Sequence, residues 1–299
     1  MLFPAPSAPR FPPAHTATIE RYPRYEDCTQ DGRLIQIAIP PALAAIWETA
    51  LDHHPGVRDA HAQGVLSLLS RLTVTSLDAP IHVERTITSN AGFELAHDRD
   101  ATGAVSRLYL NIWAEVLGVP GLAHDGVPVS AHARVSAGLA FAEHTFTRPF
   151  APPEARRVTS LAGIAGYPAL PEARYPAPPP ATAGDAPDGA TWLDDQAPDP
   201  TDLCFTLDHT DGNQHVNSLV YVRYFLDAVG RRLAAGDHPP KLRSRAFDIA
   251  YRKPSFAGER VRAHLRLFKH GALLGAAGFI AGKGEVARPR CYVRVLFGA

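Results

Sequence analysis

The sequence predicts an α+β fold made of two similar units, each with one long helix packed against an antiparallel sheet. Proline divides the chain, because 12 of the 28 prolines fall between residues 149 and 200. The segments on either side share one order of elements: a strand, a helix and then several strands. Alternation of apolar and polar residues in the later strands indicates sheets with one solvent-exposed face.

The first unit is expected over residues 18–148, after a disordered arm at 1–17 whose first 14 residues contain five prolines. Pro40 and Pro41 suit the first turn of a helix, because proline has no N–H to donate. The spacing of apolar residues then predicts a helix over 41–53, closed by His54-Pro55-Gly56. The strands of this unit are expected at 33–39, 65–75, 81–89, 92–97 and 105–115, with a hairpin turn at 98–103.

Residues 149–200 are rich in proline and alanine and show no apolar periodicity. Proline lacks a backbone donor, so such a stretch cannot hold a helix or a central strand. We therefore expect a long linker between the two units.

The second unit is expected over residues 201–299. Apolar residues recur every three or four positions from Ser218 to Ala235, which is typical of one face of a helix. Asn217 or Ser218 can cap its start and Gly236 can end it. The strands that follow are expected at 243–251, 259–267, 272–281 and 290–297.

Composition excludes several classes of function. Thirty basic and thirty acidic residues give a formal charge of zero, which argues against a nucleic-acid-binding protein. No apolar run approaches the ~20 residues that cross a bilayer. The start of the chain has no signal-peptide pattern, and three widely spaced cysteines suit a reduced cytoplasmic setting. The fourteen histidines form no metal-ligand pattern, so we expect neither a metal nor an organic cofactor.

One motif carries chemistry: Asp211-x-Asn213-x-His215-Val-Asn217, followed by a helix that contains Tyr221, Tyr224 and Phe225. This motif resembles the C-terminal half of the fatty acyl-ACP thioesterases of plants and bacteria, and more loosely the 4-hydroxybenzoyl-CoA thioesterase type. The resemblance implies two hotdog units in tandem, each a long helix wrapped by an antiparallel sheet. It also implies hydrolysis of a thioester to a free carboxylic acid in fatty acid biosynthesis, with acyl-ACP favoured over acyl-CoA as the substrate. The first unit lacks the motif and would shape the acyl tunnel, and whether the chain forms a homodimer stays open.

The chemistry of the motif can be argued from its residues. The Asp211 carboxylate can attack the thioester carbonyl or take a proton from water, and the Asn213 amide can position either. His215 can supply a proton to the leaving thiolate. A helix start presents free backbone N–H groups, so those of Val216, Asn217 and Ser218 are the expected donors to the oxyanion.

Other interpretations stand beside this one. Asp-Gly-Asn is a common turn and Asn217 a common helix cap, so the motif can be purely structural. A hotdog enoyl-thioester hydratase or dehydratase is an alternative, but that class places one more residue and a proline between Asp and His. A non-catalytic acyl-binding protein is the other alternative. It is favoured by one departure from the family, which carries Glu-Cys where this chain has Pro254 and Ser255.

Overall fold

The computed structural model describes residues 1–124, 133–236 and 242–298, and the chain divides into two compact units. The N-terminal unit comprises Ala5–Leu72 and Ser76–Pro178. The C-terminal unit comprises Pro179–Ala299 together with two short pieces, Met1–Pro4 and Thr73–Thr75. The boundary at residue 178 lies inside the stretch that the prolines mark in the sequence.

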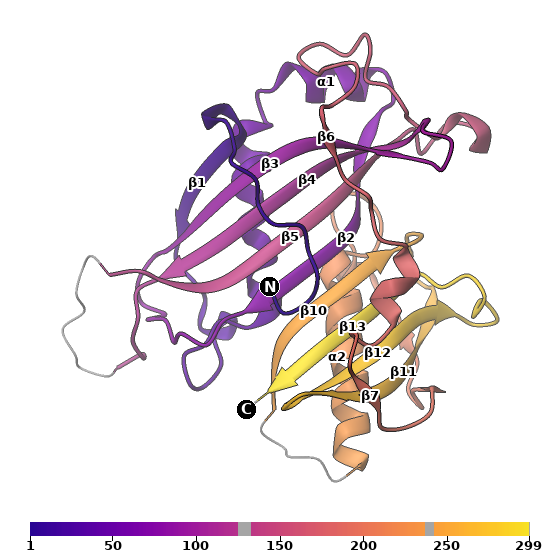
Figure 1. Cartoon of the computed structure of the whole chain (residues 1–299). Helices are drawn as coiled ribbons and strands as arrows, with labels where there is room; N and C mark the ends of the chain where they lie inside the picture. The colour runs from indigo at the N-terminus through magenta and orange to yellow at the C-terminus, as the bar shows by residue number, and fades with distance from the viewer. Residues whose placement is uncertain (125–132, 237–241, 299) are drawn as a thin grey trace. The chain divides into compact units, whose positions relative to one another are not determined.

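The sheet of the N-terminal unit has the strand order β1-β3-β4-β5-β2, and the pairs β1–β3, β3–β4 and β4–β5 are antiparallel (Figure 1). The strands are β1 (Thr16–Arg21), β2 (Leu66–Ser76), β3 (Ile87–Arg99), β4 (Val105–Gly118) and β5 (Val135–Thr147). The expected hairpin turn between β3 and β4 is confirmed: the Asp100 N–H donates to the Ala104 carbonyl, and Gly103 takes a φ of 85° that favours glycine.

The prediction of a single long helix over 41–53 is wrong. The chain forms a 3₁₀ turn at Pro40–Leu43, a π-helical turn at Ile46–Ala50 and a separate helix α1 at Pro55–Ala62. The Thr49 hydroxyl donates to the carbonyl four residues earlier, a back-bond that often bends helices. Pro55 disfavours a helical residue before it, so His54 is extended and its Nδ1 caps α1 instead of closing a helix.

Three further expectations for this unit differ from the structure. The strand expected at 33–39 is reduced to one bridge, between Cys28 and Leu34, followed by a 3₁₀ turn at Gln36–Ala38. The strand expected at 81–89 begins only at Ile87. The sequence does not predict strand β5, because its Ala and Gly residues have little preference for strands. Glycine suits position 138, because the Cβ of any other residue would lie 2.5 Å from the Ile39 side chain.

The C-terminal unit has the strand order β10-β13-β12-β11-β7, in which β7 is the short strand Thr191–Trp192, with α2 (Ser218–Ala235) across one face (Figure 1). The expected helix and all four long strands are confirmed, with ends shifted by three residues or fewer. Asn217 is the N-cap and Gly236 the C-cap of α2, as the sequence predicts. The long strands are β10 (Arg243–Tyr251), β11 (Arg260–His270), β12 (Leu273–Gly282) and β13 (Cys291–Gly298).

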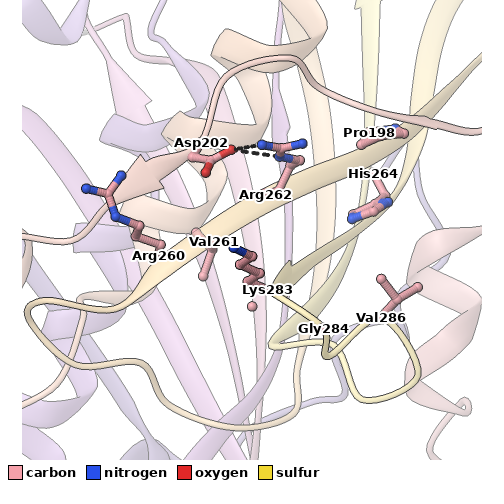
Figure 2. A pocket seen from close by; sticks show the side chains of 10 residues that line it. Pro198, Asp202, Arg260, Val261, Arg262, His264, Lys283, Gly284 and Val286 are labelled. Carbon is pink, nitrogen blue, oxygen red and sulfur yellow. Dashed lines mark hydrogen bonds and ion pairs between the residues drawn. The ribbon is translucent and has the colours of Figure 1, made fainter.

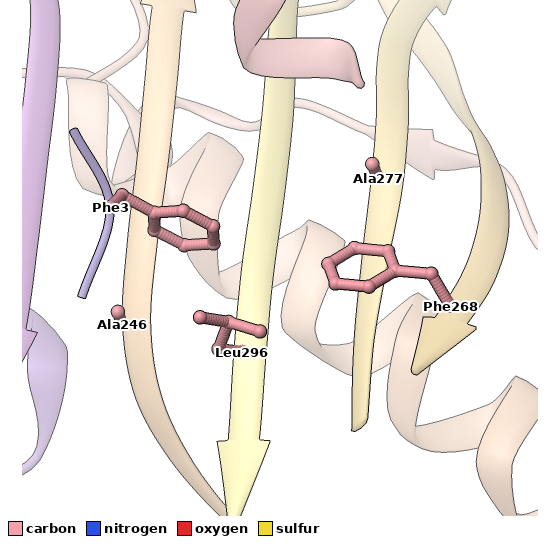
Figure 3. Packing of buried hydrophobic residues seen from close by; sticks show 5 residues of the cluster. All are labelled: Phe3, Ala246, Phe268, Ala277 and Leu296. Carbon is pink, nitrogen blue, oxygen red and sulfur yellow. The ribbon is translucent and has the colours of Figure 1, made fainter. Parts of the chain in front are cut away.

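A small cluster of buried residues packs on the C-terminal unit's sheet (Figure 3). Phe3 reaches it from the start of the chain and is only 1% exposed. Its ring also lies 4.7 Å from the Arg294 guanidinium, a cation–π distance. The start of the chain therefore differs from the disordered arm expected there, because one phenylalanine buries a large apolar surface. The other members are Ala246, Phe268, Ala277 and Leu296.

The proline-rich stretch has more contacts than a free linker. Tyr175 is buried against the N-terminal sheet, where its hydroxyl donates to Glu143 at 2.8 Å. Asp199 is 2% exposed and forms an ion pair with Arg231 of α2 at 3.1 Å. The stretch also contributes short strands to both sheets: β6 (Ala173–Arg174), β7 (Thr191–Trp192) and β8 (Ala197–Pro198).

Candidate active site

The motif residues lie on a tight loop that leads into the first turn of α2. Asp211 N–H donates to the His215 carbonyl at 3.2 Å, and Gln214 N–H donates to the Asp211 carbonyl at 2.9 Å. Gln214 has a φ of 65°, the left-handed conformation that a tight turn requires. The loop is therefore closed by its own backbone before the helix begins.

The Asp211 carboxylate is held at both oxygens. Oδ1 accepts the Asn213 N–H at 2.9 Å, and Oδ2 accepts the Asn217 amide Nδ2 at 3.0 Å. The other side-chain atom of Asn217, Oδ1, accepts the Leu219 N–H at 2.9 Å and so caps α2. One asparagine therefore ties the carboxylate to the positive end of the helix dipole. Asp211 is half-buried, so its remaining lone pairs stay open to a substrate or to water.

The expected set of oxyanion donors is reduced by tertiary contacts. The Val216 N–H donates to the Ser255 carbonyl at 2.8 Å, and the Asn217 N–H donates to the His209 carbonyl at 2.9 Å. These two donors are occupied, which corrects the expectation that all three would be free. Within the described residues, the Ser218 N–H makes no hydrogen bond and remains available at the helix start.

His215 and Asn213 differ in how firmly they are placed. Nδ1 of His215 lies 3.3 Å from the Val216 carbonyl, which can only accept, so this contact needs the proton on Nδ1. In the neutral imidazole, Nε2 is then an acceptor and can take a proton from water. The Asn213 side chain is exposed and makes no hydrogen bond to other described residues, so its amide is free to meet a ligand.

Residues outside the motif support the first turn of α2 from behind. The Tyr251 hydroxyl donates to the Ser218 carbonyl at 3.0 Å, and burial raises the pKa of Tyr251, so it stays protonated. Burial also raises the pKa of Tyr221 to about 12. His209, whose backbone holds Asn217, was missed by sequence reasoning. The signal was Thr206-x-x-His209, the spacing of a capping box, in which His209 Nδ1 accepts the Thr206 N–H at 2.9 Å.

The positions that depart from the family pattern are structural here. Ser255 is fully buried, and its carbonyl holds Val216. The Pro254 carbonyl accepts Arg290 at 3.2 Å. The two carboxylates nearest to these positions in the sequence, Asp248 and Glu259, are both engaged in ion pairs. Asp248 pairs with Arg294 at 2.8 Å, and Glu259 pairs with Arg290 at 3.2 Å.

No cluster of three or more His, Cys, Asp or Glu side chains with metal-binding geometry occurs in the part of the chain that the structure describes. None of the described helices combines the length and the apolar composition that a membrane crossing requires.

Solved structures with the same fold cover nearly the whole chain. An acyl-ACP thioesterase from Bacteroides thetaiotaomicron matches 95% of this chain and 98% of its own, with a TM-score of 0.61 and 16% identity. The chain has the fold of the acyl-ACP thioesterases. A protein assigned provisionally as an oleoyl thioesterase, from Lactobacillus plantarum, matches 95% of this chain and 96% of its own at a TM-score of 0.63 and 15% identity. The 12:0-ACP thioesterase from Umbellularia californica matches 95% and 97% at a TM-score of 0.55 and 12% identity.

At the level of sequence, no protein-family model and no curated protein matches the chain. The likeness in fold confirms the resemblance that the Asp-x-Asn-x-His motif carries, and it establishes a hotdog fold. At 12–16% identity, these likenesses are likenesses of fold.

Proposed function

We propose that this protein is a thioesterase of two hotdog units that hydrolyses acyl-ACP, or acyl-CoA, to a free carboxylic acid. The observation that carries the proposal is the Asp211 carboxylate, tied by Asn217 to the start of α2 beside the open Ser218 N–H. A thioester carbonyl whose oxygen meets this N–H would present its carbon to Asp211 or to a water that Asp211 activates. The first unit, which lacks the motif, would shape the acyl tunnel.

The remaining roles follow from the contacts. Asp211 acts as nucleophile or as general base for water, and its position is fixed by the two hydrogen bonds to its oxygens. The Ser218 N–H, at the positive end of the helix dipole, stabilises the negative charge that develops on the carbonyl oxygen. When Asp211 is the base, it takes one proton from the attacking water, and Nε2 of His215 takes up that proton and gives it to the leaving thiolate. When Asp211 is the nucleophile, the thiolate leaves as the acyl–Asp211 anhydride forms and takes its proton from solvent through His215, and water then hydrolyses the anhydride and restores the carboxylate. Asn213 orients the thioester or the water through its free amide.

The test is release of free thiol from acyl-ACP and acyl-CoA over short to long chains. We expect turnover with at least one acyl chain length and a higher kcat/KM for the ACP thioester. Hydration of an enoyl thioester, measured on the same panel without thiol release, would instead identify a hydratase. Binding of acyl thioesters with neither reaction would identify an acyl-binding protein.

A further inference from the structure

A basic pocket of about 360 Å³ lies on the C-terminal unit, and none of its lining residues belongs to the motif loop (Figure 2). Its walls come from β11, from the turn between β12 and β13, and from the segment before β9 (Leu203–Cys204). Val261, Val286 and Pro198 form apolar parts of the wall. The charged lining residues are Asp202, Arg260, Arg262 and Lys283.

The charges in this pocket do not cancel. Both Nε and one terminal nitrogen of Arg262 donate to Asp202, so these two residues neutralise each other (Figure 2). Arg260 and Lys283 are exposed, and neither side chain forms a hydrogen bond or an ion pair with another described residue. His264 adds a fourth basic group, whose pKa is lowered by burial and by Arg262. Two unneutralised cations therefore share one concave site, and a concave wall concentrates their field.

The pocket is joined to the motif loop by a short, well-bonded segment. Leu203 and Cys204 of β9 pair with Val261 and Arg260 of β11. The Phe205 N–H donates to the Glu259 carbonyl at 2.9 Å, and the Phe205 ring packs against Tyr221 of α2. The chain then runs through Leu207–His209 to Asp211. Arg260 begins β11, and Ser255, whose carbonyl accepts the Val216 N–H, lies on the loop just before it, so the pocket and the candidate site lie at the same end of the sheet.

We infer that this pocket binds the phosphate of the pantetheine arm that carries the acyl group, with Arg260 and Lys283 as its ligands. The inference rests on the proposed thioesterase function, because ACP and CoA both attach the acyl group through this arm. Arg suits a phosphate through its planar fork of donors, and Lys through a point charge. The apolar wall at Pro198 and Val286 would contact the arm itself.

The decisive experiment compares acyl-phosphopantetheine with acyl-pantetheine, which lacks only the phosphate. In the double variant Arg260→Gln/Lys283→Gln we expect KM for acyl-phosphopantetheine, acyl-ACP and acyl-CoA to rise roughly tenfold, because two exposed cations that attract the phosphate are removed. KM for acyl-pantetheine and kcat for all substrates should stay unchanged. Lys269→Gln is the matched control, since Lys269 is an exposed cation on the same strand outside the pocket.

A second variant predicts the opposite sign. Asp202→Asn releases the Arg262 guanidinium into the pocket, so KM for the phosphorylated substrates should fall roughly twofold to threefold. The inference is overturned if the double variant leaves KM for acyl-phosphopantetheine unchanged, if acyl-pantetheine is affected equally, or if only acyl-CoA responds. The last result would assign the pocket to the nucleotide phosphates of CoA.

Calorimetry with 4′-phosphopantetheine and pantetheine separates this inference from the proposed function. Tighter binding of the phosphorylated arm, lost in Arg260→Gln/Lys283→Gln, supports the pocket even if no thioester is hydrolysed. Equal binding of both molecules by the wild-type protein overturns it even if hydrolysis is rapid.

Discussion

Exchanging Asp211 and Asn217 separates a catalytic carboxylate from a structural one. In Asp211→Asn alone, the new amide can still accept the Asn213 N–H, but its NH₂ then faces the NH₂ of Asn217 and one hydrogen bond is lost. In the exchange variant Asp211→Asn/Asn217→Asp, the amide at 211 donates to the carboxylate at 217. The second oxygen at 217 still caps the Leu219 N–H, so all three hydrogen bonds can form again.

The two effects have different magnitudes. The lost hydrogen bond involves a charged but half-buried group, so Asp211→Asn should lower the free energy of unfolding by about 1.5 kcal/mol, or roughly 3–6 °C in Tm. Loss of a general base lowers kcat by roughly 10²–10⁴, which corresponds to about 3–5 kcal/mol in the activation free energy. The exchange variant should regain the stability and none of the activity, because its carboxylate has moved from the loop to the helix cap.

The assay is thiol release at saturating substrate, with thermal unfolding measured on the same samples. Asp208→Asn is the matched control: Asp208 is an exposed carboxylate on the same loop, and it makes no hydrogen bond or ion pair within the described residues. Its kcat and Tm should equal those of the wild type. If the exchange variant recovers both stability and kcat, Asp211 serves the fold of the loop and the assignment is wrong.

Two further predictions concern stability. Burial lowers the pKa of His144 from 6.5 to about 4, so the folded state binds fewer protons than the unfolded state between these two pH values. The contribution of His144 to the free energy of unfolding is therefore complete above pH 6.5 and declines by about 3 kcal/mol as the pH falls to 4. This decline should be absent when urea unfolding of His144→Leu is measured over the same pH range. Phe3→Ala should lower the free energy of unfolding of the C-terminal unit by about 3–5 kcal/mol, because a fully buried ring is removed, whereas Phe150→Ala, which removes an exposed ring, should have no measurable effect on either unit.

The C-terminal unit could be predicted almost entirely because its signals are local. The three-and-four spacing of apolar residues in 218–235 specifies a helix, and Asn217 and Gly236 mark its ends without help from distant residues. Strict alternation specifies β11 in the same way. The N-terminal unit has no such agreement between local signals, since Pro40, Thr49 and Pro55 each interrupt one helix and the small residues of β5 hide a strand.

By itself, the sequence determined the motif, the helix that it precedes and the order of elements in the C-terminal unit, because these depend on residues fewer than about twenty positions apart. Only the tertiary structure decided which groups remain free to act. Val216 N–H is occupied by Ser255, which lies on the loop after β10, and Arg262 is neutralised by Asp202, 60 residues earlier. Such pairings arise when distant segments fold together, so no local pattern records that the Ser218 N–H and the side chains of Arg260 and Lys283 are among the groups left without a partner in the described part of the chain.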